Sequence, residues 1–218
     1  MAINYGLLKE SENEIMIEFK EFYSFVIGIN TKLYEYLQDD VESLRSISEE
    51  QLEIISDLVK KAEITQGDLL ANCIWLIQKN EPRASHLRFI IAIIYSIKNL
   101  LNVCESTLKL AKFFSKIQIN VDLFKEFLNA HKLTIELSKK IADSLSERDP
   151  NIIQQNLKND FENYHQEIKT LIRKCAYIHD DNLYKDNKDL INFIINLGRL
   201  ERIIDRQENI LHDFAYIK

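Results

Sequence analysis

Glycine and proline are scarce in this chain of 218 residues, which contains four Gly and two Pro. Proteins built from short β-strands need many turns, and turns depend heavily on these two residues. The sequence therefore excludes a fold of many short strands and favours a few long helices. Hydrophobic residues make up 46% of the chain, which is ample for a packed core.

The chain also lacks the cysteine patterns of disulfide-rich and zinc-binding proteins. Its three cysteines, Cys73, Cys104 and Cys175, are odd in number and show no C-x-x-C spacing. Neither a disulfide framework nor a thiolate zinc site is indicated. A reducing cytosol fits best, and we interpret Cys73 and Cys175, which fall near matching points of the two halves, as small buried apolar residues.

Long apolar runs and a secretory leader are missing as well. The longest unbroken apolar run lies around residues 89–95, far below the roughly 20 residues of a membrane-spanning helix. Residues 1–10 lack the basic-then-apolar order of a secretory signal. We therefore expect a cytoplasmic protein that reaches membranes only through its partners.

An excess of basic residues is the next absence, since the formal net charge is -6 at pH 7. Binding to a nucleic-acid backbone needs clustered Lys and Arg, and the pair Lys60-Lys61 is flanked by Asp57 and Glu63. The sequence has no Gly-rich phosphate loop and no G-x-S-x-G motif. We expect neither a nucleic-acid partner nor enzyme activity.

What the chain does contain is helical periodicity. The apolar spacing and the residues that interrupt it predict six long helices. We expect them over residues 12–37, 48–79, 82–114, 120–146 and 149–178 and, after a break at 180–182, up to Tyr216. Ser48 and Gln51 have the spacing of a capping box. Pro82 is expected in the first turn of the third helix, Asn120 as the cap of the fourth, and Asp149-Pro150 at the start of the fifth.

Two of these helices look like copies of one another. Residues 90–103 match residues 190–203 apolar for apolar, for example Ile90 with Leu190 and Leu100 with Leu200. The repeat predicts an all-α fold of two tandem antiparallel three-helix bundles related by internal duplication. We place the bundles at residues 1–117 and 118–218 and expect them to pack as one rigid body.

Two motifs carry a family resemblance. From Cys73 to Ala92, an apolar helix end is followed by a short polar turn, Pro82, a small-residue pair, then Leu-Arg and an apolar run. This order resembles a helix junction of the PhoU family, phosphate-transport regulators built from two three-helix bundles. Residues 200–205, Leu-Glu-Arg-Ile-Ile-Asp, are similar to the family's second-repeat signature, whose Glu and Asp bind metal clusters in some members. In the first repeat the matching positions are Leu101 and Glu105, so a site there is not expected.

The resemblance implies a metal site in the second repeat. Glu201 and Asp205 lie four apart on one helix face, and Glu162 on the preceding helix falls near a partner carboxylate of the family. Carboxylates suit iron or another divalent cation. The alternative is a salt-bridge face, since Arg202 and Arg206 lie nearby.

Glu162 and His165 also form an E-x-x-H motif, which occurs twice in di-iron carboxylate bundles. The sequence has no second copy, but His165 becomes an extra ligand if a metal binds near Glu201. Two alternative hypotheses remain. One is a metal-binding carboxylate bundle that stores or oxidises iron, and the other is a homo-oligomeric bundle without ligand.

Residues 83–88, with two Arg at a helix start, either attract phosphate or simply begin the helix.

For function, the resemblance implies a non-catalytic adaptor. It would bind the ATPase subunit of a phosphate ABC transporter and, where the host has one, a phosphate-sensing histidine kinase. Such an adaptor damps phosphate uptake and signalling when phosphate is plentiful, and a homodimer is expected.

Overall fold

The computed structural model describes residues 5–39, 47–116, 121–145, 150–180, 188–215 and 217. Within these ranges the regular structure is entirely helical. The elements are α1 (Tyr5–Asp39), α2 (Glu49–Asn80), α3 (Ser85–Phe114), α4 (Val121–Ser144), α5 (Pro150–Asp180) and α6 (Lys188–Ala215). The predicted all-α class is confirmed. Asn120, Asp149, Tyr216 and the predicted boundary at residues 117 and 118 lie outside the described residues.

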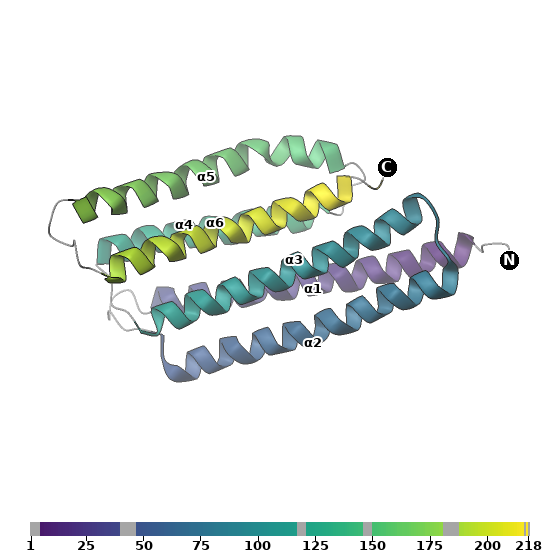
Figure 1. Ribbon diagram of the computed structural model, residues 1–218, viewed down its shortest axis with the longest axis horizontal. Helices are drawn as coiled ribbons and strands as arrows, with labels where there is room; N and C mark the ends of the chain where they lie inside the picture. The colour runs from purple at the N-terminus through teal and green to yellow at the C-terminus, as the bar shows by residue number, and fades with distance from the viewer. Residues whose placement is uncertain are drawn as a thin grey trace.

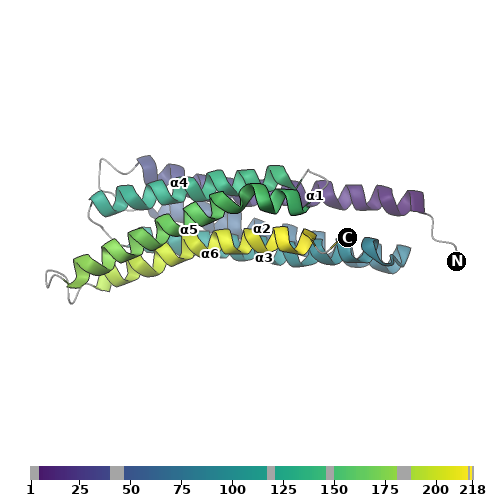
Figure 2. The same ribbon diagram turned by 90° about the horizontal axis from the view of Figure 1, so that it is seen from above.

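The six helices form two three-helix bundles, α1–α3 and α4–α6, that lie side by side (Figure 1). The bundles meet through α3 against α6 and α1 against α4. Seen from above, α3 and α6 lie along one side of the molecule and α1 and α4 along the other (Figure 2). The outer helices α2 and α5 lie at opposite edges in Figure 1. This arrangement confirms the predicted pair of bundles.

Helix α3 is the core helix of the molecule. Its length and composition would allow it to cross a membrane, but it packs against α1, α2 and α6. Its apolar residues are fully buried at every turn, including Ile90, Ile93, Ile97, Leu100 and Leu110. Within the apolar run at residues 89–95, Ile90, Ala92 and Ile93 face the core, whereas Ile91 and Tyr95 are exposed.

Two helix starts differ from the prediction. Helix α1 begins at Tyr5 instead of near residue 12, because Leu8, which is 1% exposed, continues the buried face toward the N-terminus. Pro82 does not lie in the first turn of α3. Glu81 and Ala84 both have positive φ, 44° and 51°, so the chain leaves the helical conformation at both positions and α3 begins at Ser85.

The predicted capping box of α2 is confirmed. The Gln51 amide donates to Ser48 Oγ at 3.1 Å, and the Ser48 amide donates to Gln51 Oε1 at 2.8 Å. The three cysteines are free and buried, which confirms the prediction made for Cys73 and Cys175. Burial raises the pKa of Cys73 and of Cys104 to about 12, and that of Cys175 to about 11. Their thiols therefore stay protonated at neutral pH.

Buried polar side chains connect the two bundles. Tyr23 of α1 donates its hydroxyl to Gln207 Oε1 at 2.7 Å. Gln207 Nε2 in turn donates to Ser138 Oγ of α4 at 2.8 Å and to the Ile203 carbonyl at 3.1 Å. Both amide hydrogens and the amide oxygen of Gln207 are thus used, although its side chain is almost completely buried. One residue of α6 therefore holds α1 and α4 together.

A second buried contact joins α1 to α4. His131 Nε2 lies 2.6 Å from Asn30 Oδ1 and donates to it, while Nδ1 has no hydrogen-bond partner. The ring edges of Tyr34 and Phe127 lie close, with ring centroids 5.7 and 5.8 Å from that of His131. Burial lowers the pKa of His131 to about 3, so the imidazole is neutral in the folded protein.

Replacing Gln207 tests the first connection. Gln207→Leu keeps the side-chain volume but leaves the buried Tyr23 hydroxyl without an acceptor, which costs about 1–3 kcal/mol of folding free energy. Urea denaturation measures the loss. The control is Gln78→Leu on the exposed face of α2, which should change stability by less than about 0.5 kcal/mol. Equal effects of the two substitutions would contradict the role of the network.

Acid should destabilise the protein through His131. Its pKa is about 3 when folded but near 6.5 in an unfolded chain, so the unfolded state takes up the proton first. The stabilising contribution is complete above about pH 6.5 and is lost as the pH falls toward about 3. From about pH 7 to pH 5 we expect the free energy of unfolding to fall by about 2 kcal/mol from this group.

Denaturation curves at the two pH values measure that loss. The control is His131→Phe, which cannot titrate and should lack this part of the pH dependence, whatever its own stability. Parallel pH profiles for the two proteins would show that His131 is not the titrating group.

Candidate metal centre

The candidate centre lies between α5 and α6. On α6, Glu201, Asp205 and Glu208 follow the i, i+4, i+7 spacing of one helix face. On α5, Tyr164 is buried and its hydroxyl lies 2.8 Å from Thr134 Oγ1 of α4. Because Thr134 already donates to the Ala130 carbonyl, Tyr164 is the donor. This bond anchors α5, and the next residue, His165, lies against the acidic face of α6.

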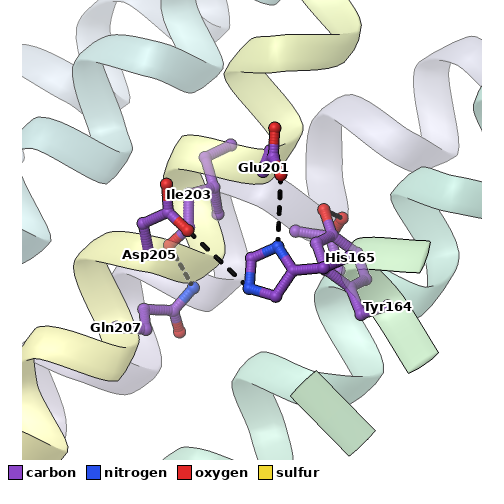
Figure 3. A network of polar contacts seen from close by, with 7 residues as sticks. Tyr164, His165, Glu201, Ile203, Asp205 and Gln207 are labelled. Carbon is purple, nitrogen blue, oxygen red and sulfur yellow. Dashed lines mark hydrogen bonds and ion pairs between the residues drawn. The ribbon is translucent and has the colours of Figure 1, made fainter. Parts of the chain in front are cut away.

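His165 lies between two carboxylates of α6 (Figure 3). Its Nδ1 is 3.3 Å from Glu201 Oε1, and its Nε2 is 3.8 Å from Asp205 Oδ1. Ligand atoms of His165, Asp205 and Glu208 all lie within 4.8 Å of one another. Of the side chains that the structure describes, these form the one group of three His, Cys, Asp or Glu residues with such spacing.

The local charge favours a cation. Partial burial raises the pKa of Asp205, and the neighbouring Glu201 and Glu208 carboxylates raise it further, while His165 and Arg206 act in the opposite direction. A raised carboxylate pKa means that the ionised form is poorly compensated by its surroundings. A bound divalent cation would supply that compensation.

Comparisons with known proteins bear on the fold. No protein-family model matches the chain. An uncharacterized protein of Mycoplasma genitalium is 27% identical over 220 residues, spanning 99% of this chain and 96% of the relative. Its homolog from Mycoplasma pneumoniae is 28% identical, spanning 100% of this chain and 96% of the relative.

Solved structures match over almost the whole chain. PhoU from Pseudomonas aeruginosa superposes with a TM-score of 0.79 at 15% identity, covering 96% of this chain and 97% of that one. The phosphate transport system regulatory protein PhoU from Streptococcus pneumoniae has the same TM-score, 0.79, at 18% identity, covering 96% of each chain. The fold is that of PhoU.

On this PhoU fold the predicted metal residues lie in different surroundings. Asp205 belongs to the cluster, and Glu201 contacts the His165 ring. Glu162 has a side chain that is 65% exposed and pairs with Lys158 at 3.8 Å. The assignment of Glu201, Asp205 and Glu162 as metal ligands stays a prediction. Glu208 was not among the sequence candidates, although its spacing of three from Asp205 places it on the same face.

The first repeat of the PhoU fold lacks an equivalent group among its described residues. Glu105 is half-exposed and pairs with Lys109 at 3.5 Å. Leu101, one turn earlier, offers no ligand atom. Among the described residues, the grouped His, Asp and Glu side chains therefore lie in the second repeat.

The donor set suits a transition metal. One imidazole and two carboxylates are ligands typical of iron, manganese and zinc sites. If Glu201 accepts a hydrogen bond from Nδ1–H of His165, the ring presents Nε2 toward Asp205 and Glu208. Such an outer carboxylate fixes the tautomer and orientation of a metal-ligating histidine. The residues therefore fit a cation, with Glu201 as a positioning group.

Metal binding should depend on His165 and Asp205. After dialysis against Mn²⁺, Fe²⁺ or Zn²⁺, bound metal is measured by mass spectrometry of the protein. His165→Ala and Asp205→Asn each remove a ligand and should weaken binding more than about a hundredfold, since loss of an outer hydrogen-bond partner alone costs about 10–100-fold. Glu201→Gln should weaken it less.

Glu162→Gln is the matched control, because it removes a carboxylate from α5 that lies outside the cluster. We expect it to bind metal like the unaltered protein. Loss of metal from this variant, with retention in Asp205→Asn, would place the centre elsewhere.

Proposed function

We propose that the protein is a cytoplasmic, non-catalytic regulator of phosphate transport. The observation that carries this proposal is the correspondence of the whole chain with two PhoU structures, at a TM-score of 0.79 and 96% coverage in each case. One of those proteins is described as a phosphate transport system regulatory protein. Correspondence over both bundles supports a shared mode of action better than a match to one bundle alone would.

The proposed mechanism is contact with partner proteins. The protein binds the ATPase subunit of a phosphate ABC transporter and, in hosts that have one, a phosphate-sensing histidine kinase. It damps uptake or signalling when phosphate is plentiful. Long helices with a continuous core suit this role, because they present side chains in fixed positions over a large area. A homodimer would double the number of docking surfaces.

Affinity capture tests the adaptor proposal. A tagged copy is isolated from its own host grown in high and in low phosphate, after gentle crosslinking, and the co-purified transporter ATPase is quantified. We expect enrichment over an unrelated tagged helical protein, and we expect its extent to change with phosphate. Absence of the ATPase under both conditions would count against the adaptor.

A second candidate function rests on the cluster of His165, Asp205 and Glu208. A carboxylate bundle that stores or oxidises iron would use such groups, and Fe²⁺ oxidation by dioxygen would be visible as ferric absorbance that His165→Ala abolishes. Di-iron bundles, however, place two E-x-x-H motifs on facing helices. The sequence holds one, so the adaptor remains the better-supported function.

A further inference from the structure

The outward side of the central helix pair is an exposed face of which the functions above use Asp205 alone. Its residues from Ile91 to Lys116, which lies just beyond the end of α3, recur every three or four positions and form one row. Those of α6 follow one side of the helix from Lys188 to Asn209. We call this surface the α3–α6 face. It comprises Ile91, Tyr95, Lys98, Asn102, Glu105, Lys109, Lys112 and Lys116, and Lys188, Ile191, Ile195, Arg202, Asp205, Arg206 and Asn209. Figure 1 views the molecule from this side, with α3 and α6 in front of α1 and α4.

The face is basic although the chain is acidic. The whole chain has 34 acidic and 28 basic residues. The exposed acidic residues of the face are Glu105 and Asp205. Its exposed basic residues are Lys98, Lys109, Lys112, Lys116, Lys188, Arg202 and Arg206. The exposed side chains of this face thus carry a net positive charge in an acidic protein, and they attract anions.

The sequence does not show this concentration of charge. The lysines at 98, 109, 112 and 116 are separated by three to eleven residues, and the basic residues of α6 begin about ninety residues after Lys98. Only the packing of α3 beside α6 brings them onto one surface. Helical periodicity and tertiary packing together create this concentration of charge.

Large apolar side chains accompany the charges. Ile91 and Tyr95 of α3 are 37% and 58% exposed, and Ile191 and Ile195 of α6 are 47% and 52% exposed. The two pairs occupy equivalent positions of the duplicated helices. Because α3 and α6 run in opposite directions (Figure 1), the pairs lie toward opposite ends of the face. Each end of the face thus has its own pair of exposed apolar side chains.

We propose that the α3–α6 face binds the surface of an anionic lipid bilayer. Surface-bound helices combine Lys and Arg, which attract acidic headgroups, with apolar side chains that enter the boundary between headgroups and acyl chains. Tyrosine is favoured at that depth, since it has an apolar ring and a polar end. The α3–α6 face has basic residues and exposed isoleucines on both helices, and an exposed tyrosine, Tyr95, on α3.

The dimensions of the face suit a bilayer surface. Helices of 30 and 28 residues are about 45 and 42 Å long at ~1.5 Å per residue. Charges spread over that length match an extended anionic surface. The core side of α3 stays buried, so the protein lies on the bilayer and does not span it. The proposal departs from the expectation that membranes are reached only through partners, and it does not depend on the transporter.

Vesicle sedimentation tests the proposal on the full chain. Vesicles of phosphatidylcholine mixed with phosphatidylglycerol are compared with vesicles of phosphatidylcholine alone. We expect binding to the mixed vesicles, weakened by salt because the attraction is screened. Lys98→Gln/Lys112→Gln/Lys116→Gln should weaken binding on the order of a hundredfold, at about fivefold for each lysine removed.

The matched control changes the same charge elsewhere. Lys125→Gln/Lys132→Gln/Lys139→Gln removes three exposed lysines from α4, which lies behind α6 in Figure 1, and should leave binding nearly unchanged. Thermal unfolding followed by circular dichroism verifies that both triple variants fold. Ile191→Ser/Ile195→Ser should weaken the binding that persists at high salt.

Several outcomes would overturn the proposal. Equal loss in the two triple variants would mean that net charge, not this face, decides binding. No binding to the mixed vesicles, together with binding to polyglutamate, would indicate an acidic protein as the occupant. No vesicle binding, together with a change in oligomeric state of the α3 variant, would indicate a second copy of this chain.

Discussion

The packing of α3 against α6 is the contact on which the rest of the structure depends. It joins the two repeats through their duplicated apolar helices, with Ile90, Ile97 and Leu100 of α3 and Leu197 and Leu200 of α6 all completely buried. Because the two helices are antiparallel, equivalent features of the repeats are carried to opposite ends. The same contact leaves one continuous outward side along α3 and α6, and the basic face follows from it.

Apolar packing alone does not specify how two similar bundles meet. A duplicated Ile and Leu surface can slide by one helical turn and still bury much the same area, since the hydrophobic effect is not directional. Gln207 and His131 remove that freedom. Gln207 needs Tyr23 and Ser138 on two other helices, and His131 needs Asn30. A shift of one turn would leave these buried groups unpaired, which is costly in an apolar core. Polar residues in the core thus set the register.

The features that the sequence predicted are those decided within one helix. Apolar spacing located all six helices, and the Ser48–Gln51 capping box is local to one turn. Pro82 was misplaced because the conformation of Ala84, with φ of 51°, depends on how α2 and α3 meet. Glu208 was missed because a third carboxylate gains meaning only when His165 of another helix lies beside it. The burial of His131 could not be predicted, because histidine occurs on both buried and exposed faces of helices.

The metal centre and the basic face share one residue, Asp205. Without a cation, its carboxylate and those of Glu201 and Glu208 reduce the positive potential of the face at α6. A cation held by His165, Asp205 and Glu208 would offset that acidic charge and make the face more basic. Thermodynamic linkage then requires the reverse coupling, so an anionic surface beside the face would strengthen cation binding by the same factor. In the first repeat Lys109 already pairs with Glu105 at 3.5 Å, so that end of the face is basic without a metal. The charge of the face is therefore fixed along α3, whereas along α6 it depends on whether a cation is bound.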